Sequence, residues 1–292
     1  MTPLPGIHHN VSFEDYQKWE AINFSRLKPI RKTASKCRWA MDHPKEPTPA
    51  MVLGSALHVA TLEPARFDGM FYICPPCDRR TKEGREIFER AEQEARGRLI
   101  IRSGDDLLGQ LEQVKGMAAA VHASRAAQPF ISAPGQNEVS MIWLDQETGL
   151  LCKARVDRLI EHFAPWGCPV VVEIKSTRDA EDHSFGRDCH SMGYAGQAGC
   201  YCLGVKAVTG KMPAHVFIAV ESEPPHDLNV HALDSQSLQT GILQYRQMLN
   251  RYQECAALDT WPGYLDEHGR PDTVHKLSLP PWAHDLKQTE AA

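Results

Sequence analysis

Long apolar runs are missing from this sequence. It contains no stretch of about eighteen consecutive apolar residues, so it predicts no membrane-spanning helix. The residues from Met1 to Gly6 also lack the basic and then apolar segments of a secretory signal. We therefore expect a cytoplasmic protein that has no membrane partner.

A second cysteine pair is missing as well. Cys74 and Cys77 have the spacing of a zinc or redox motif, but a zinc site needs another pair at suitable spacing, and none follows. The two prolines between them and Asp78 after them do not resemble the helix start of a redox motif. The nine cysteines are an odd number scattered along the chain, which is typical of reduced thiols. We interpret this motif as a loop and leave the purpose of its thiols open.

Net positive charge is also missing, because the formal net charge is −5 at pH 7. This value does not exclude a nucleic-acid partner, since the distribution of charge matters more than the sum. One segment has no acidic residue among its six cations, which are Arg26, Lys28, Arg31, Lys32, Lys36 and Arg38. This basic block could line a phosphate-binding surface or form a solvated helix face, and charge alone does not decide between them.

The remaining composition is that of an ordinary globular protein. Of 292 residues, 42% are hydrophobic and 24% are charged, which is enough to bury a substantial core. We predict one α/β domain over residues 1–265, in which a central mixed sheet is flanked by helices. Its parts are a helical N-terminal part over 20–128, a sheet core over 135–235 and a C-terminal helix over 235–257, and residues 266–292 are expected to form a loosely ordered tail.

Local patterns predict the individual elements of this domain. The first twenty residues are expected to be irregular, and Ser25 is expected to cap the first helix. Further helices are predicted near 51–62, 83–96, 104–125, 188–206 and 235–257. Strands are predicted for the hairpin 138–144 and 150–160, and at 170–175, 214–220 and 229–233.

The segment from Val170 to Lys175 carries the most chemical information. Because side chains alternate along a strand, Glu173 and Lys175 are expected on one face. The preceding strand could bring Asp157 beside Glu173, and two carboxylates with an ammonium group could hold Mg²⁺ and position a water. The pattern indicates metal-dependent phosphodiester cleavage. The alternative is a half-solvated strand whose charges face water.

Four other residues could join this group. Glu138 begins the first hairpin strand, although it could be an ordinary carboxylate at a strand end. His58 lies on a helix of small and apolar residues, where a lone histidine is usually a hydrogen-bonded core residue. Gln197 and Tyr201 are four residues apart and share a helix face. Small neighbours would let that helix approach the sheet closely, and the alternative for this pair is a packing helix with a buried tyrosine.

These residues follow one another in the order found in PD-(D/E)XK nucleases. The motifs are Gly54-Ser55-Ala56-Leu57-His58, Glu138, Lys153-Ala154-Arg155-Val156-Asp157, Glu173-Ile174-Lys175-Ser176-Thr177 and Gln197-x-x-x-Tyr201. More narrowly, the chain resembles the nuclease domain of exonuclease VIII, the RecE type of phages and prophages, over roughly residues 10–265. Glu173 stands where many relatives have Asp, and Val156 where Pro is frequent. The resemblance implies a restriction-endonuclease-like core with a central mixed sheet flanked by helices.

The resemblance also implies a Mg²⁺ cofactor, for which Mn²⁺ would substitute. Asp157, Glu173 and the backbone carbonyl of Ile174 would hold the ion. Glu138 and His58 would complete a second metal position, about 4 Å from the first.

The remaining residues receive roles in catalysis and DNA binding from the same resemblance. Lys175 would orient the attacking water and favour its hydroxide form. Gln197 and Tyr201 would steady the scissile phosphate or the Lys175 ammonium group. The residues expected to bind DNA are Arg26, Lys28, Arg31, Lys32 and Arg155.

Relatives of this kind digest one strand of linear double-stranded DNA from the 5′ end and leave a 3′ tail for recombination by strand annealing. The resemblance therefore implies an exodeoxyribonuclease that acts on DNA ends, forms a homo-oligomeric ring around the DNA and works with a single-strand annealing protein. Three alternatives stay open: a structure-specific DNA endonuclease on the same fold, an iron–sulfur nuclease, and a non-catalytic DNA-binding scaffold. An iron–sulfur nuclease needs a late cysteine triplet, whereas only Cys255 lies late in this sequence.

Overall fold

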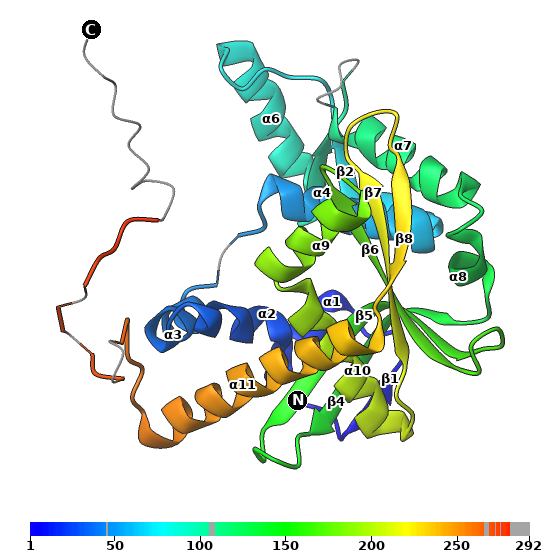
Figure 1. Cartoon of the computed structure of the whole chain (residues 1–292). Helices are drawn as coiled ribbons and strands as arrows, with labels where there is room; N and C mark the ends of the chain where they lie inside the picture. The colour runs from blue at the N-terminus through cyan, green and yellow to red at the C-terminus, as the bar shows by residue number, and fades with distance from the viewer. Residues whose placement is uncertain (45, 105–108, 266–268, 272, 275, 281–292) are drawn as a thin grey trace, which may run out of the picture.

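The fold is built on one six-stranded mixed sheet, seen in a computed structural model (Figure 1). The structure describes residues 1–292 except 45, 105–108, 266–268, 272, 275 and 281–292. The sheet order is β1-β4-β5-β6-β7-β8, in which only β6 and β7 run parallel. These strands are β1 (Gly6–His8), β4 (Gln136–Leu144), β5 (Leu151–Phe163), β6 (Cys168–Thr177), β7 (Ala214–Glu221) and β8 (Leu228–Ala232).

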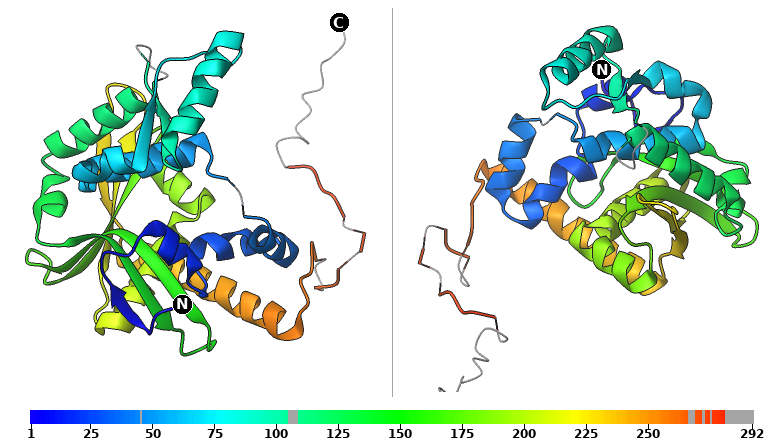
Figure 2. Two further views of the ribbon diagram at one scale, coloured as in Figure 1. Left: turned by 180° about the vertical axis from the view of Figure 1, so that it is seen from behind. Right: turned by 90° about the horizontal axis from the view of Figure 1, so that it is seen from above.

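Helices cover both faces of the sheet, which makes the protein a three-layer α/β fold (Figures 1 and 2). One face packs against α10 (Tyr194–Thr209) and α11 (Ser235–Leu258), and its core includes Val171 and Cys200. The other face packs against α4 (Pro49–Leu62), α7 (Gln110–Ala123) and α8 (Gln128–Ser132), and its core includes Leu57 and Val172. The predicted fold class, with helices on both faces of a mixed sheet, is confirmed.

Strands β5 and β6 pair over only part of their length. Their ladder runs from Phe163 and Cys168 to Arg158 and Val172, and no pair is formed beyond that point. β6 nevertheless continues beside β7 as far as Thr177, while β5 continues beside β4. The two strands therefore separate, and we call this point the β5–β6 fork. The first residues past the fork, one on each strand, are Asp157 and Glu173.

Helices α10 and α11 approach each other through glycines. A Cβ at Gly199 would lie 2.5 Å from the carbonyl carbon of Gly241, and a Cβ at Gly241 would overlap the carbonyl oxygen of Ala195. The prediction that small residues let this helix approach the sheet is correct for Ala198, which packs with Phe217 of β7. For Gly199 the prediction is wrong, because the absence of a side chain there makes room for the backbone of α11 instead.

The N-terminal part differs from the sequence prediction in two ways. The first twenty residues are regular: β1 pairs with β4, and α1 (Phe13–Lys18) follows it. The cap of α2 (Phe24–Leu27) is Asn23 rather than Ser25, since the Asn23 side chain accepts the backbone N–H of Arg26. The remaining elements of this part are η1 (Lys28–Arg31), α3 (Ala34–Asp42), η2 (Pro64–Arg66) and α5 (Phe67–Met70).

Lys153 fixes α1 to the sheet. This residue is 1% exposed, and its ammonium group donates to the backbone carbonyls of Tyr16, Gln17 and Trp19 at 2.7–3.2 Å. These are carbonyls at the C-terminal end of α1, where a cation stabilises the unpaired acceptors. Burial lowers the pKa of Lys153 to about 8, which still leaves it mostly charged at pH 7.

The polar stretch over 79–128 is divided in the structure: its residues up to Arg102 belong to a smaller unit beside the sheet, whereas α7 packs on the main sheet itself. β2 (Phe71–Cys74) pairs in parallel with β3 (Leu99–Arg102), and α6 (Lys82–Ala95) connects them. In Figures 1 and 2, α6 projects from the body of the protein. The apolar residues 99–101, between the helices predicted near 83–96 and 104–125, thus lie in a strand, and part of the predicted 104–125 helix lies outside the described residues.

Two further predictions concern the second half of the chain. The helix predicted over 188–206 is two helices, α9 (Asp182–Ser191) and α10, because Gly193 has a φ of +74° between them. The loosely ordered tail predicted over 266–292 falls mostly outside the described residues. Within the described part of the chain, no helix is both long and apolar enough to cross a membrane.

The glycine contact between α10 and α11 gives a first prediction. Gly241→Ala would push a methyl group into the backbone of α10, and we expect the free energy of unfolding to fall by roughly 1–3 kcal/mol. Thermal unfolding followed by circular dichroism measures this change. Gly186→Ala in α9 is the matched control, because a Cβ there meets nothing within 4 Å and should be neutral or stabilising by about 0.5–1 kcal/mol. Equal melting temperatures for the two variants would contradict the proposed packing.

Candidate active site

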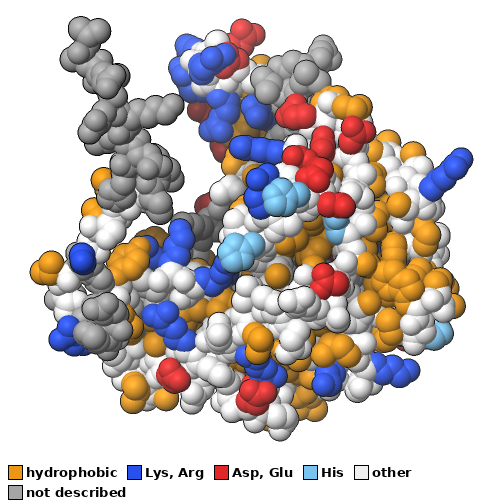
Figure 3. All heavy atoms as spheres, viewed as in Figure 1, with side chains coloured by type: hydrophobic (Ala, Val, Ile, Leu, Met, Phe, Trp, Pro, Cys, Tyr) orange, Lys and Arg blue, Asp and Glu red, His pale blue; other side chains and the backbone are white. Residues whose placement is uncertain are grey.

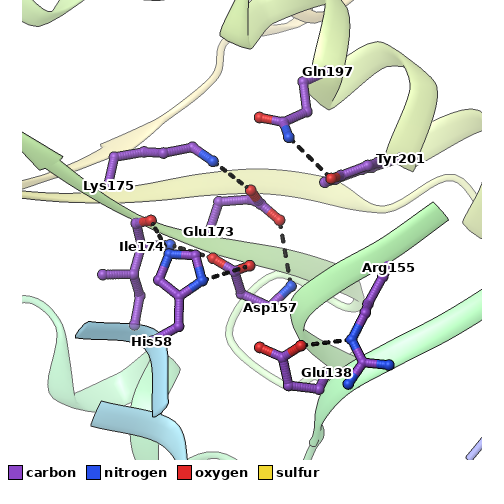
Figure 4. Close-up of polar contacts among 9 residues, drawn as sticks. All are labelled: His58, Glu138, Arg155, Asp157, Glu173, Ile174, Lys175, Gln197 and Tyr201. Carbon is purple, nitrogen blue, oxygen red and sulfur yellow. Dashed lines mark hydrogen bonds and ion pairs between the residues drawn. The ribbon is translucent and has the colours of Figure 1, made fainter. Parts of the chain in front are cut away.

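The candidate site is centred on the β5–β6 fork, where carboxylates replace the missing ladder hydrogen bonds (Figure 4). Asp157 Oδ2 accepts the backbone N–H of Ile174 at 2.9 Å, and Glu173 Oε1 accepts the backbone N–H of Asp157 at 3.3 Å. Both carboxylates are buried, with residue exposures of 8% and 1%. Buried backbone donors need acceptors. The Asp157 and Glu173 side chains therefore satisfy the backbone N–H groups at the fork and also supply its negative charge.

Lys175 completes this group from the same strand. Its ammonium group lies 2.7 Å from Glu173 Oε2, and its side chain is 13% exposed. Val172 and Ile174 pack in the core on the opposite face, so the predicted alternation of this strand is confirmed. The ring of Tyr194, the first residue of α10, lies 5.1 Å from the ammonium group. Such a cation–π contact stabilises the charged form.

His58 reaches the site from α4, on the opposite face of the sheet from α10 (Figure 4). Its Nδ1 lies 3.2 Å from Asp157 Oδ1, and its Nε2 lies 2.8 Å from the carbonyl oxygen of Ile174. The helix therefore presents a histidine to the cluster rather than to the apolar core. The Ile174 carbonyl, predicted as a metal ligand, is occupied by His58 in this structure.

Glu138 enters from β4 with an unusual backbone. Its φ of +52° lies in the left-handed region, which costs a non-glycine residue on the order of 1–3 kcal/mol. The ladder between β4 and β5 skips the Glu138–Asp157 pair while Asn137 and Val139 on either side stay paired. Strain of this kind often occurs at functional sites, and here it coincides with a side chain aimed at Asp157.

Arg155 holds Glu138 in place. Its Nε lies 2.7 Å from Glu138 Oε2, and its Nη1 donates to the Val11 carbonyl and the Ser140 hydroxyl at 2.8 and 3.0 Å. The Arg155 side chain is only 10% exposed. These contacts give Arg155 a role in positioning Glu138, and its expected role in DNA binding stays a prediction.

Three side chains that could bind a metal converge at this point of the fork. One ligand atom each from His58, Glu138 and Asp157 lie within 4.8 Å of one another. Carboxylate oxygens with an imidazole nitrogen suit a divalent cation such as Mg²⁺ or Mn²⁺. Glu173 lies outside this triad, since its two oxygens contact Lys175 and the Asp157 backbone. The residues thus fit a divalent ion, and the expected second metal position stays a prediction.

Gln197 and Tyr201 lie above Glu173 on α10 and are half-buried (Figure 4). The Gln197 amide donates to the Tyr201 hydroxyl at 2.9 Å, so the predicted shared helix face is confirmed. Burial raises the pKa of Tyr201 well above its usual value, and the charge of Glu173 acts in the same direction. The hydroxyl is neutral at pH 7 and can donate a hydrogen bond to an anion in the site.

The acids of the cluster are held at different pKa values. Burial and the Asp157 charge raise the pKa of Glu173 to about 7, against the opposing effect of Lys175. Burial would also raise the pKa of Asp157, but the His58 charge and hydrogen bond lower it. Burial disfavours a charged His58, yet Asp157 raises its pKa to about 9. Without a bound cation the cluster therefore keeps protons that a cation would displace.

The basic block reaches the site at one end only. Lys28 is half-buried, and its pKa is lowered by burial and by the charges of Arg31 and Lys175. Arg31 is fixed by the carbonyls of His190 and Ser191 at the end of α9, at 3.0 and 3.5 Å. Of the other members, Arg26 lies on α2, Lys32 follows η1, and Lys36 and Arg38 lie on α3. Sequence reasoning missed Tyr194, since nothing in its local pattern distinguishes it from a core aromatic residue.

Comparison with known proteins agrees with this geometry. The chain matches the family model described as a PDDEXK-like domain of unknown function (DUF3799) over residues 23–269. The chain belongs to this family. Its membership of the PD-(D/E)XK superfamily, inferred from sequence motifs, is thereby confirmed. The presence of a PDDEXK-like domain supports the interpretation of the protein as a nuclease.

Solved structures add a similarity of fold. The crystal structure of a "Putative exonuclease" from Eubacterium rectale aligns with a TM-score of 0.59 and 14% identity, covering 96% of this PDDEXK-like chain and 100% of the other. The crystal structure of SSO0001 aligns at a TM-score of 0.29 with 14% identity, covering 68% and 84% of the two chains, which is too weak for any conclusion. No curated protein matches the sequence.

The protonation of the cluster predicts how metal affinity depends on pH. His58 must lose a proton to act as a ligand, and Glu173 must lose one to complete the negative charge around the ion, so divalent-metal affinity should rise with pH. Between pH 6 and 8, Glu173, with a pKa of about 7, should contribute about tenfold, and His58, with a pKa of about 9, should add a rise of up to about tenfold per pH unit, with proton release. Calorimetric titration with Mn²⁺ in buffers of different ionisation enthalpy measures the affinity and the proton release. Glu173→Gln should remove the Glu173 part of the rise, and an unchanged slope in that variant would refute the assignment.

Proposed function

We propose that this protein is a Mg²⁺-dependent exodeoxyribonuclease that digests linear double-stranded DNA. The observation that carries the proposal is the fork, where Asp157, Glu173 and Lys175 meet in the arrangement that gives the PD-(D/E)XK superfamily its name. Mn²⁺ should substitute for Mg²⁺, because the candidate ligands are oxygens and one imidazole nitrogen.

The residues at the fork would have different roles in phosphodiester hydrolysis. Asp157, Glu138 and His58 would hold the metal, with Glu173 completing its environment. A bound divalent cation supplies Lewis acidity and stabilises the charge on attacking and leaving oxygens. Lys175, held between Glu173 and Tyr194, is placed to orient a water and lower its pKa. Arg155 keeps Glu138 aimed at the metal from its strained backbone position.

Two residues of the basic block are suited to the DNA phosphates. Within the described part of the chain, the Lys28 ammonium group has no carboxylate partner, although it lies close to the charges of Arg31 and Lys175. Half-buried cations that repel one another favour an anion between them. A DNA phosphate beside the fork would relieve this repulsion. Arg26 and Lys32 would contact phosphates further along the strand.

The resemblance to exonuclease VIII supplies the finer parts of the proposal. Digestion from the 5′ end, 3′ tails for strand annealing, a ring-shaped homo-oligomer and a single-strand annealing partner are expected from it. These features depend on subunit contacts and partners, so labelled DNA ends and solution mass are the measurements that test them.

Substitutions at the fork give the direct test of chemistry. Asp157→Asn keeps the shape of the side chain and the acceptor for Ile174 N–H but removes its charge, and Lys175→Met removes the cation. Each should lower the rate of DNA cleavage by at least about a hundredfold, because the metal and the attacking water lose their positioning. Asp227→Asn, on an exposed loop residue, is the control. Wild-type rates in either fork variant would refute the site.

The type of cleavage is read from labelled substrates in the same assay. Linear duplex DNA labelled at the 5′ or 3′ end is compared with a closed circular plasmid, with Mg²⁺ or a chelator. Release of the 5′ label without nicking of the circle supports the exonuclease. Nicking of the circle would instead establish an endonuclease. No cleavage with any divalent metal would leave the DNA-binding scaffold.

A separate prediction concerns the Lys28 phosphate contact. DNA affinity should fall steeply with salt, because each phosphate contact releases counterions. Lys28→Gln should reduce the slope of log affinity against log salt by about one and weaken binding uniformly across sequences. Lys211→Gln, at an exposed position after α10, serves as the control. Fluorescence anisotropy without metal gives these slopes, and identical slopes for Lys28→Gln and wild type would remove Lys28 from the DNA surface.

A further inference from the structure

A cavity of about 510 Å³ lies beside the basic block and is not used by the proposed chemistry. Its described lining residues are Pro29, Ser35, Lys36, Trp39 and Ala40. They come from η1 and the exposed side of α3. The volume lies in the range of small-ligand sites and is sufficient for a nucleobase with its sugar.

Trp39 is the aromatic residue among the described residues that line this cavity. The residue is 54% exposed, which is unusual for so large an apolar side chain. Its indole stacks on His43, with ring centroids 4.5 Å apart and an interplanar angle of 13°. Trp39 lines the cavity, whereas His43 is not among its described lining residues, so indole surface beyond the stacked face borders it. An exposed aromatic side chain that borders a cavity is suited to stacking on a base.

Cations and aromatic rings alternate around Trp39. Lys36 also lines the cavity, and its ammonium group lies 2.8 Å from the Tyr264 hydroxyl and 4.8 Å from the ring centroid. Arg38 lies over the Trp261 ring at 5.7 Å and pairs with Asp42 at 3.0 Å. Figure 3 shows Lys and Arg side chains over the α2–α3 side of the molecule. The surface therefore combines positive charge with exposed rings.

Helix η1 links the cavity to the candidate active site. Arg31, at its end, donates to the carbonyls of His190 and Ser191, shortly before Tyr194 in the chain, and Pro29 of the same helix lines the cavity. A polynucleotide whose phosphate lay at Lys28 could thus place a neighbouring base against Trp39. Only an unpaired base offers its face to an aromatic ring, because bases in a duplex are already stacked on their neighbours.

We propose that Trp39 and Lys36 form a stacking site for a base of single-stranded DNA. The site extends the DNA surface of the proposed nuclease and rests on that function for its substrate class. Its occupant is an unpaired strand, chosen because the basic block is complementary to phosphates and Trp39 to a base. A second copy of this chain is the competing occupant.

The test measures binding of a fluorescent single-stranded oligothymidylate to the full chain by anisotropy, with a chelator present so that no cleavage occurs. Trp39→Ala and Trp39→Leu should each weaken binding by about tenfold or more, since one base–aromatic stack is lost. Trp39→Phe should retain most of the affinity. Trp166→Ala is the matched control, because Trp166 is also exposed, at 43%, but lies in the β5–β6 turn.

An oligonucleotide with abasic sites separates stacking from charge. Wild type and Trp39→Leu should bind it equally, whereas Lys36→Gln should weaken binding to both oligonucleotides. Equal binding of the thymidylate by wild type and Trp39→Leu would overturn the proposal. A change in sedimentation without a change in DNA binding would overturn it too, and would assign the surface to contact between copies.

Failure of this inference is distinct from failure of the proposed function. Metal-dependent cleavage of duplex DNA by the wild-type protein tests the nuclease without any substitution at Trp39. Cleavage with unchanged oligonucleotide binding in Trp39→Leu would refute the stacking site alone. Stacking without cleavage by the wild-type protein would refute the nuclease alone.

Discussion

The separation of β5 from β6 is the constraint on which the site depends. Where the ladder ends, two backbone N–H groups would be buried without partners, and Asp157 and Glu173 accept them instead. Because those hydrogen bonds fix both carboxylates, the charges are positioned before any ligand arrives. The fork also opens a place at the sheet that α4 and α10 can reach from opposite faces, and they bring His58, Gln197 and Tyr201 to it.

In the absence of a cation, such a cluster of buried charged groups is expected to lower the stability of the fold. Burial, together with the charge of Asp157, raises the pKa of Glu173 to about 7, and the left-handed backbone of Glu138 adds strain. The surrounding fold compensates through apolar cores on both faces of the sheet and through the Arg155 contacts that hold Glu138. A divalent ion would relieve the repulsion, so metal binding and stability are expected to be linked.

The substrate side of the molecule has the opposite electrostatic character. Lys28 and Lys175 place positive charge next to the acidic fork, and the basic block continues along α3 toward Trp39. The net charge of −5 conceals this local asymmetry. An acidic protein can therefore attract a polyanion to one region of its surface. The positive and negative side chains lie next to each other at the fork, where hydrolysis is proposed.

The sequence by itself determined the strands from β4 to β8, the alternation of β6 and the set of candidate site residues. Glu173 and Lys175 share a face because a strand has a period of two, and the motif order identified the PD-(D/E)XK superfamily. Only the tertiary structure decided which groups are in contact. Arg155 binds Glu138, and His58 contacts the Ile174 carbonyl. The ring of Tyr194 lies over Lys175, and Gly199 faces α11. Periodicity specifies a face, whereas these contacts join segments distant in sequence, and they follow from where the strands part and the helices pack.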